Sequence, residues 1–315
     1  MEGLLSWLAT AELLPRKEVI ARRRSTRPVL WRLGASVLAA GLAVVGPAGP
    51  AEAAGDPAVA ALQVGLQARR VYNHSIDGIA GPQTDRAVRR LQRKARVRVD
   101  GVVDRRTRAA LGRLGRPAFG TRVLRLGVVG WDVSMLQFLL ASHGFPLGVF
   151  DGRVGWHTQA AIRRFQRWAR LPVDGVAGPV TLAALRAPPA ASPILLSPPL
   201  EWPPGDGFGP RGRRFHAGID FPAPRRTPVV ASEAGRVVWA RRRRGGWGLL
   251  VTVAHGNGVR TMYAHLARID VRLGQRVAAG RRLGLVGASG NASGPHLHYE
   301  VRLRGAAIDP LTALR

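Results

Sequence analysis

The sequence predicts a multidomain protein of the α plus β class, in which two small three-helix bundles are followed by a β-rich domain. A repeat at a fixed offset of 74 residues indicates the two bundles, and a proline-rich stretch follows the second copy. Short apolar runs between glycine-rich turns then indicate the β-rich domain. At 315 residues the chain is longer than a single hydrophobic core usually grows, so several domains are expected.

Residues 1–53 have the pattern of a signal peptide with a long basic lead-in. Arginines precede the apolar run at 33–45, and Ala51 and Ala53 occupy the −3 and −1 positions of a signal peptidase site. This run is short for a membrane span, so no stable span is expected after the signal is removed. We therefore expect a secreted protein that is extracellular or associated with the cell wall.

Composition limits the chemistry that the chain can perform. The sequence has no cysteine, which excludes disulfides, thiolate catalysis and cysteine-ligated metals, so a metal would have to bind to His, Asp or Glu. The net charge is +29. Outside the cell a basic surface attracts anionic wall polymers. No nucleic-acid-binding motif is present, so nucleic acid is not an expected partner.

The repeated segments predict two modules, at 57–115 and at 122–187. In the first, Pro82 suits the opening position of a helix and Asp104 can cap the next helix, each after an Asp-Gly turn. Apolar residues at helical spacing in each copy would form a small core. The matching pairs are LQVGL and LQFLL, DGIAGPQT and DGRVGWHT, AVRRLQ and AIRRFQ, and VDGVVDRRT and VDGVAGPVT.

The shared pattern, L-Q, then D-G-x-x-G-x-x-T, then A-[VI]-R-R-[LF]-Q, resembles the peptidoglycan-binding domain 1 family. The resemblance implies that both modules bind peptidoglycan and perform no catalysis. The first copy departs from the family where DRRT replaces the usual GPxT, although Asp104 there should still cap a helix. We interpret the repeated Asp-Gly residues as turn formers and not as ligand contacts.

Residues 188–199 are proline-rich and predict a semi-rigid linker, which places the β-rich domain at 200–315. Within that domain the run GPHLHYEVRL alternates in the manner of a strand. Successive side chains of a strand point to opposite faces, so His296 and His298 should share one face. The apolar residues that alternate with them should face the core, and the two histidines should face a groove.

Other residues of this domain have a spacing that suits a metal site. His216 and Asp220 stand four residues apart, and His265 lies in a separate apolar run. Catalytic zinc typically takes three protein ligands plus water, so two imidazoles on one groove wall would need a third ligand from another segment. Of the remaining histidines, His74 and His143 are interpreted as loop residues between helices and His157 as a residue at a helix start. His255 is interpreted as a surface residue before a hairpin turn.

Three segments of the domain resemble the signature segments of the M23 family, the lysostaphin-type (LytM) zinc endopeptidases of peptidoglycan. They are FGPRGRRFHAGIDFPAP, HGNGVRTMYAHL and SGPHLHYEV, within a match that covers most of the domain. The resemblance implies a β-rich fold similar to the duplicated hybrid motif. It also implies one Zn²⁺ per chain, bound by His216, Asp220 and His298.

The same resemblance leaves His265 and His296 beside the metal without binding it, which implies that they are the catalytic pair. One imidazole can accept the proton of the attacking water, and the other can stabilise the tetrahedral oxyanion. We assign His296 as the base and His265 as the oxyanion stabiliser, although the reverse order fits the sequence too. The chain departs from the family at Pro210, where tyrosine is common, and at Ala292, where serine is common.

Together these features predict a secreted zinc-dependent endopeptidase that hydrolyses peptide bonds in the stem peptide or cross-bridge of bacterial peptidoglycan. The two modules would tether it to the wall. The alternative is a catalytically inactive protein with the M23 fold that activates a separate cell-wall amidase. Such relatives usually lose zinc ligands, so the complete set of five residues favours the enzyme. A purely adhesive wall protein would leave the metal-binding pattern unexplained.

Overall fold

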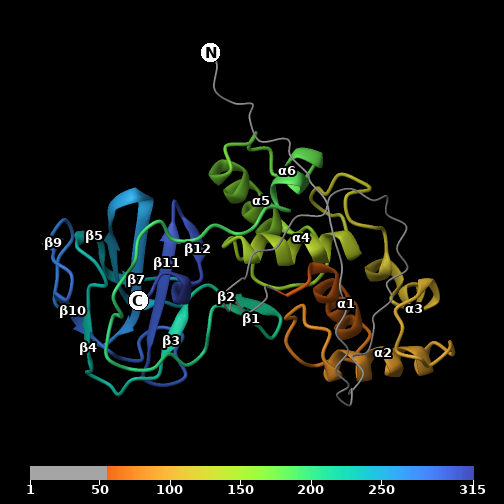
Figure 1. Ribbon diagram of the computed structural model, residues 1–315, viewed down its shortest axis with the longest axis horizontal. Helices are drawn as coiled ribbons and strands as arrows, with labels where there is room; N and C mark the ends of the chain where they lie inside the picture. The colour runs from red at the N-terminus through yellow and green to blue at the C-terminus, as the bar shows by residue number, and fades with distance from the viewer. Residues whose placement is uncertain (1–54) are drawn as a thin grey trace, which may run out of the picture.

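The computed structural model describes residues 55–315 as a helical region joined to a β-rich region (Figure 1). The signal peptide predicted at 1–53 lies outside the described residues. Within 55–315, no helix is both long enough and apolar enough to cross a membrane. The predicted fold class is confirmed, since the helices come first along the chain and antiparallel strands follow.

Two bundles of three α-helices make up the helical region. Helix α2 begins at Pro82, and Asp104 Oδ1 accepts a hydrogen bond of 2.7 Å from the Thr107 N–H in the first turn of α3. Both helix starts therefore lie where the sequence predicts them. The first bundle contains α1 (Pro57–Ala68), α2 (Pro82–Lys94) and α3 (Arg105–Ala110), and the second contains α4 (Trp131–Ser142), α5 (Trp156–Trp168) and α6 (Pro179–Ala184).

Each Asp-Gly turn of the bundles is fastened to the preceding helix by a buried glutamine. In the second bundle the Gln137 amide donates to Asp151 Oδ1 at 2.8 Å and to the Arg153 carbonyl at 3.0 Å. Its Oε1 accepts from the Gly152 N–H at 2.8 Å. The Asp-Gly residues are turn formers, as interpreted from the sequence. The same contacts recur at Gln63 with Asp77, at Gln92 with Asp100, and at Gln166 with Asp174.

Replacing Gln137 with alanine should destabilise the second bundle. The change leaves the buried Gly152 N–H without its acceptor, and an unsatisfied buried group costs about 1–3 kcal/mol. We expect the free energy of unfolding to fall by about that amount, measured by chemical denaturation and far-UV circular dichroism. Gln159→Ala is the matched control, because Gln159 lies on α5 with no side-chain hydrogen bond within 55–315. Equal losses in the two variants would contradict this role.

The β-rich region contains one main sheet, a smaller sheet and a hairpin, all antiparallel. The main sheet has the order β12-β11-β7-β6-β5-β9, with β3 also paired to β11, the smaller one has the order β4-β10-β8, and β1 pairs with β2. The strands are β1 (Gly209–Arg211), β2 (Arg214–His216), β3 (Ile219–Phe221), β4 (Pro228–Val230), β5 (Gly235–Arg243), β6 (Gly248–Ala254), β7 (Val259–Leu266), β8 (Arg268–Ile269), β9 (Arg276–Val277), β10 (Arg282–Leu285), β11 (Leu297–Leu303) and β12 (Ala306–Ile308).

Strand β11 separates the core from the groove in the way that its alternation predicts. Leu297, Tyr299 and Val301 are fully buried in a core that also contains apolar residues of the smaller sheet. His298 and Glu300, which alternate with them, line a cleft on the opposite face. The strand therefore presents its polar side chains to the floor of the cleft, where they are buried, while its apolar side chains hold the two sheets together.

The stretch predicted as a linker at 188–199 is partly incorporated into the β-rich core. Leu196 is fully buried there. Its N–H donates to the Ala313 carbonyl at 2.8 Å, and its carbonyl accepts from the Arg315 N–H at 3.1 Å. Leu196 ends a run of only three apolar residues between prolines, which is too short to show a periodicity, so the sequence pattern did not predict this contact.

The two bundles pack against each other and against the β1–β2 hairpin, which the sequence did not predict. Helices α1 and α4 bring apolar residues of both bundles into one buried cluster, and Phe215 of β2 packs against it. The hairpin also accepts backbone hydrogen bonds from the bundles, from Ile76 to Gly212 at 2.9 Å and from Phe150 to Arg213 at 2.8 Å. The helical and β-rich regions are thus joined by packing as well as by the chain.

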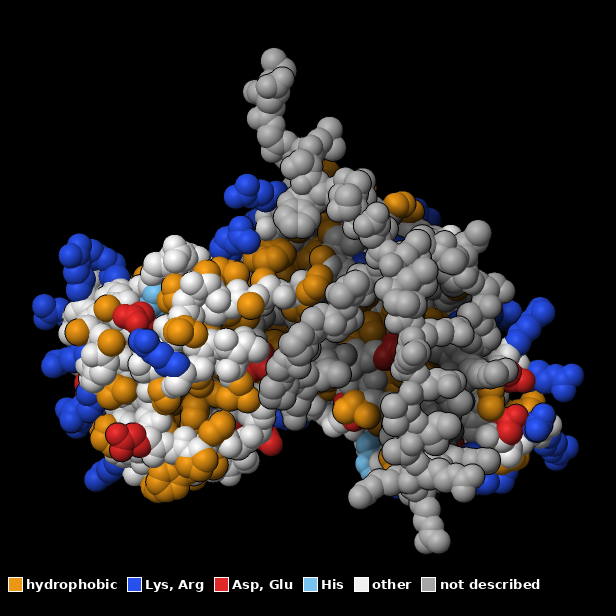
Figure 2. All heavy atoms as spheres, in the orientation of Figure 1, with side chains coloured by type: hydrophobic (Ala, Val, Ile, Leu, Met, Phe, Trp, Pro, Cys, Tyr) orange, Lys and Arg blue, Asp and Glu red, His pale blue; other side chains and the backbone are white. Residues whose placement is uncertain are grey.

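The basic charge is distributed over both regions. On the face drawn in Figure 2, blue Lys and Arg side chains project from the outer ends of the β-rich and helical regions. At the tip of the β5–β6 hairpin, the guanidinium of Arg241 lies 4.5 Å and that of Arg243 lies 5.4 Å from the centre of the Trp239 ring. These exposed arginines are therefore held against an aromatic ring.

Candidate metal centre and cleft

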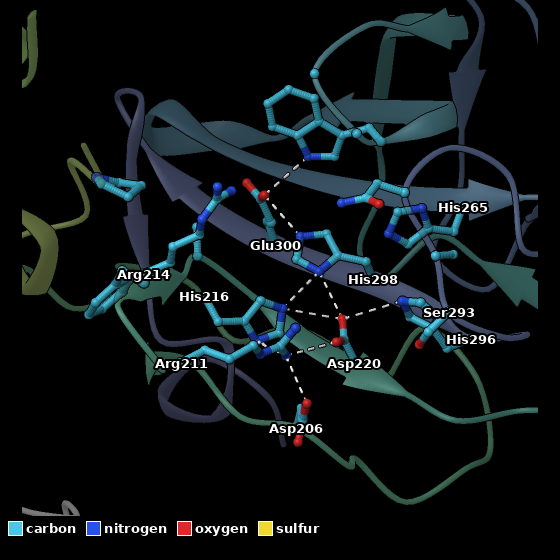
Figure 3. A pocket seen from close by; sticks show the side chains of 18 of the residues that line it. Asp206, Arg211, Arg214, His216, Asp220, His265, Ser293, His296, His298 and Glu300 are labelled. Carbon is cyan, nitrogen blue, oxygen red and sulfur yellow. Dashed lines mark hydrogen bonds and ion pairs between the residues drawn. The ribbon is translucent and has the colours of Figure 1, made fainter. Parts of the chain in front are cut away.

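Three side chains from three strands converge in the cleft (Figure 3). His216 ends β2, Asp220 lies in the middle of β3, and His298 lies on β11. Asp220 stands directly opposite His298 in the antiparallel register, and such partners have Cβ atoms about 4.5–5.5 Å apart. Strand pairing therefore brings together two residues that are 78 positions apart in the sequence.

The possible ligand atoms of these residues form a tight triangle. His298 Nδ1 lies 2.8 Å from Asp220 Oδ1 and 3.0 Å from His216 Nε2, and the last two atoms are 3.2 Å apart. Zinc bonds of about 2.0–2.1 Å give a tetrahedron with edges of about 3.3 Å, which is close to these separations. Two imidazole nitrogens and a carboxylate oxygen are also suitable zinc donors, so the three side chains fit the ion.

Neighbouring acceptors orient both imidazoles. His298 Nε2 donates to Glu300 Oε1 at 3.0 Å, which leaves Nδ1 facing the triangle. His216 Nδ1 donates to the Gly207 carbonyl at 2.7 Å, which leaves Nε2 facing it. These tautomers are assigned from the acceptors present. Arg302 in turn holds the Glu300 carboxylate. Such partners fix the ring orientation of a ligating histidine and raise its basicity.

Charges inside the group stabilise its ionised form. Burial alone would raise the pKa of Asp220, but hydrogen bonds from His216 and His298 and their charge hold it well below its usual range. Burial would lower the pKa of His298, yet hydrogen bonds to Asp220 and Glu300 raise it to about 9. Despite complete burial, the Arg302 charge and the His298 hydrogen bond lower the pKa of Glu300 to about 2. Both carboxylates therefore carry negative charge at neutral pH.

His265 and His296 lie beside this triangle (Figure 3). Their ring centres are 4.7 Å apart, and His296 Nε2 is 3.9 Å from Asp220 Oδ1. His265 has a φ of +59°, a conformation that is strained for a residue other than glycine. A hydrogen bond of 2.7 Å between its Nδ1 and the Ser289 carbonyl holds it there. The structure thus brings the five predicted site residues together.

Both of these imidazoles keep Nε2 available. His296 Nδ1 donates to the Gly294 carbonyl at 2.9 Å, in the same way that His265 Nδ1 donates to Ser289. Burial lowers the pKa of His265 despite that hydrogen bond, so this ring is neutral at neutral pH. A neutral imidazole that is protonated on Nδ1 has a lone pair on Nε2 and can accept a proton there.

The five residues line an open cleft of about 1060 Å³. The β-rich domain supplies most of its lining. The second bundle supplies the rest through Pro146, Gly148 and Arg164. The size is at the upper end of the range for ligand pockets, which leaves room for an extended peptide.

The other histidines differ in part from their sequence interpretation. His74 lies in a loop and His157 lies at the start of α5, as expected. His143 lies directly after α4, as expected, and is buried with its Nε2 at 3.0 Å from the Leu185 carbonyl. The surface interpretation is wrong for His255, which is half-buried and bonded through both ring nitrogens. These two rings pack within their own domains, away from the cleft.

Two residues of the site were not identified from the sequence. Glu300 follows His298 by two positions, so the alternation that paired His296 with His298 could have placed it on the same face. Arg211 on β1 gives no comparable signal. Its Nη2 donates to Asp220 Oδ2 at 2.9 Å, which leaves Oδ1 of that carboxylate directed to the triangle.

Comparison with known proteins identifies three matching regions. Residues 214–310 match the model of peptidase family M23, and residues 55–111 and 130–185 match the model of a peptidoglycan binding domain. The DD-carboxypeptidase/endopeptidase Mpg of Neisseria meningitidis serogroup B is 46% identical over 99 residues, which are 31% of this chain and 23% of Mpg. The peptidoglycan DD-endopeptidase ShyA of Vibrio cholerae is 44% identical over 98 residues, with coverages of 31% and 23%.

This chain spans about a quarter of the length of those two curated relatives. Among solved structures, the catalytic domain of the antimicrobial peptidase lysostaphin from Staphylococcus simulans is 32% identical, with a TM-score of 0.33. The similarity covers 35% of this chain and 90% of that domain. The matched region at 214–310 includes all five of the residues that converge in the cleft.

Proposed function

Because the chain carries two peptidoglycan-binding domains followed by a peptidase M23 domain, we propose that it is a secreted, zinc-dependent endopeptidase that hydrolyses peptide bonds of bacterial peptidoglycan. The observation that carries the proposal is the triangle of His216 Nε2, Asp220 Oδ1 and His298 Nδ1, with two further imidazoles beside it in an open cleft. The export pattern at 1–53 supports the location outside the cytoplasm.

His216, Asp220 and His298 would hold the zinc ion. When bound, zinc polarises a carbonyl oxygen and lowers the pKa of water towards about 7, which supplies a nucleophile at neutral pH. Arg211 and Glu300 contribute by orientation, since each fixes a ligand side chain from outside the triangle. The negative charge of the Asp220 carboxylate stabilises a cation that is bound between the three side chains.

His296 is the group that accepts a proton from the attacking water. Its Nδ1–H is already used by the Gly294 carbonyl, and its Nε2 lies 3.9 Å from Asp220 Oδ1, at the edge of the triangle. His265 presents its Nε2 to the same space and stabilises the oxyanion once that nitrogen carries a proton. The pair also provides a donor for the leaving amine.

The two bundles keep the catalytic domain on an insoluble substrate. Tethering raises the local concentration of peptide without any new contact in the cleft, so even weak binding by each bundle increases the rate of cleavage on intact walls. The basic surface of both regions adds a salt-dependent attraction to anionic wall polymers.

Removing the metal should abolish activity reversibly. We expect dialysis against a zinc chelator to lower the release of soluble fragments from purified peptidoglycan by more than about 100-fold, because several kcal/mol of transition-state stabilisation is lost. Stoichiometric Zn²⁺ should restore it. Release is measured by liquid chromatography and metal content by elemental analysis. Unchanged release by protein that contains no metal would refute the zinc mechanism.

A further inference from the structure

The second bundle reaches the cleft through helix α5. Trp168 Nε1 on this helix donates to the Leu303 carbonyl at the end of β11 at 3.2 Å, and the Arg304 guanidinium lies 5.2 Å from the centre of the Trp168 ring. Residues four apart share one face of a helix, so Arg164 faces the same end of the strand. Arg164 lines the cleft, and its Nη2 donates to the Pro146 carbonyl at 2.7 Å.

This end of the cleft carries uncompensated positive charge. The β-rich side supplies Arg302, which is paired with Glu300 at 2.6 Å, and Arg214 lines the cleft from β2. Within residues 55–315, neither Arg164 nor Arg214 has a carboxylate at ion-pair distance. Desolvation in the cleft and repulsion by Arg302 both lower the pKa of Arg164. The Arg164 guanidinium is therefore available to an anion that enters from solvent.

We propose that Arg164 binds a carboxylate of the peptide substrate at this end of the cleft. The inference rests on the proposed endopeptidase function and adds to it a substrate-binding residue that comes from a wall-binding bundle. A guanidinium presents its N–H donors in a planar fork that matches the two oxygens of a carboxylate. The second bundle would thus select the peptide as well as tether the enzyme.

Contacts along β11 indicate on which side of the metal-binding triangle the carboxylate lies. Arg302 is next to Leu303, whose carbonyl Trp168 of α5 contacts, and both Arg302 and Arg164 line the cleft. The Arg302 guanidinium binds Glu300 at 2.6 Å, and Glu300 in turn binds His298 Nε2 at 3.0 Å. The carboxylate therefore belongs on the Glu300 side of the metal-binding triangle.

The test compares Arg164→Gln with the unchanged protein, both loaded with zinc, on cross-linked muropeptides with free carboxylates and on the same muropeptides after amidation. Hydrogen bonds to charged groups contribute about 1.5–3 kcal/mol, so we expect about a tenfold or larger loss in kcat/KM on the free-carboxylate substrate, carried by KM. Once the carboxylates are amidated, the substitution should have little further effect. This non-additivity is what a direct contact produces and a structural role does not.

Arg167→Gln is the matched control, because it removes the same charge from the same helix and Arg167 does not line the cleft. It should leave the kinetics on both substrates within about twofold of the unchanged protein. Equal losses on free and amidated muropeptides, or equal effects of Arg164→Gln and Arg167→Gln, would overturn the proposal. Thermal unfolding of both variants shows whether a loss comes from instability.

A binding measurement separates this inference from the proposed function. Muropeptide affinity is measured by calorimetry in the zinc-loaded His296→Ala background, with and without Arg164→Gln. A preference for free carboxylates that depends on Arg164 would support the inference. If the unchanged protein then failed to cleave peptidoglycan, the endopeptidase alone would be refuted. Cleavage by the unchanged protein with no dependence on Arg164 would refute the inference alone.

Discussion

His298→Ala abolishes both zinc binding and peptidoglycan cleavage if the triangle is the metal site. The substitution removes Nδ1, which lies 2.8 Å from Asp220 Oδ1 and 3.0 Å from His216 Nε2, and leaves only two ligands. Loss of an outer partner of a metal ligand already costs about 10–100-fold in affinity, so loss of a ligand should cost more than about 100-fold. Zinc affinity is measured by competition with a chromophoric chelator, and activity by fragment release.

The fold should survive this change, because Glu300 keeps its contacts with Arg302 at 2.6 Å and with Trp247 Nε1 at 3.2 Å. His157→Ala is the matched control, since His157 is exposed on α5 away from the cleft. It should bind one zinc per chain and retain full activity. A His298→Ala protein with unchanged zinc content would remove His298 from the ligand set.

His296→Ala should keep the metal and lose activity. Among the described residues, the His296 side chain makes one hydrogen bond, to the Gly294 carbonyl. Its Nε2 stands 3.9 Å from the nearest oxygen of Asp220, so its removal leaves the triangle intact. A positioned general base contributes about 10²–10⁴-fold to the rate. We expect a fall of that size in kcat at full zinc occupancy, measured on soluble muropeptides.

The comparison that sharpens this prediction is the pair of variants His296→Ala and His298→Ala. His296 lies directly before β11 and His298 lies at its start on the same face, so similar disturbance of the backbone is expected in both, and only the second should lose metal. If His296→Ala also lost zinc, the assignment of His296 as a base that does not bind the metal would be wrong. Activity above about a tenth of the original would show that another group is the base.

Several features of the site follow from local sequence pattern. Alternation in the run from His296 onwards predicted a polar face and a buried face, and the buried residues Leu297, Tyr299 and Val301 confirm it. Pro82 and Asp104 marked helix starts because capping chemistry is local. In each case the relevant interactions lie within a few residues of one another, so periodicity and turn chemistry are sufficient.

The features that escaped prediction depend on contacts between distant segments. Trp168 and Leu303 are 135 residues apart in the sequence, and their hydrogen bond is what brings Arg164 to the cleft. Packing of α1 on α4 and of Phe215 on both bundles likewise joins segments that lie far apart in the sequence. The hydrophobic periodicity of a single sequence does not show which surface of one element packs against which surface of another.

Mass spectrometry of purified peptidoglycan after incubation with the zinc-loaded protein distinguishes an endopeptidase from an activator of another enzyme. We expect new, chelator-sensitive fragments with a free amine and a free carboxyl at one peptide bond within the stem peptide or cross-bridge. Peptidoglycan that stays intact with folded, zinc-loaded protein, but is cut between glycan and peptide once a wall amidase is added, would contradict the endopeptidase and identify an amidase activator.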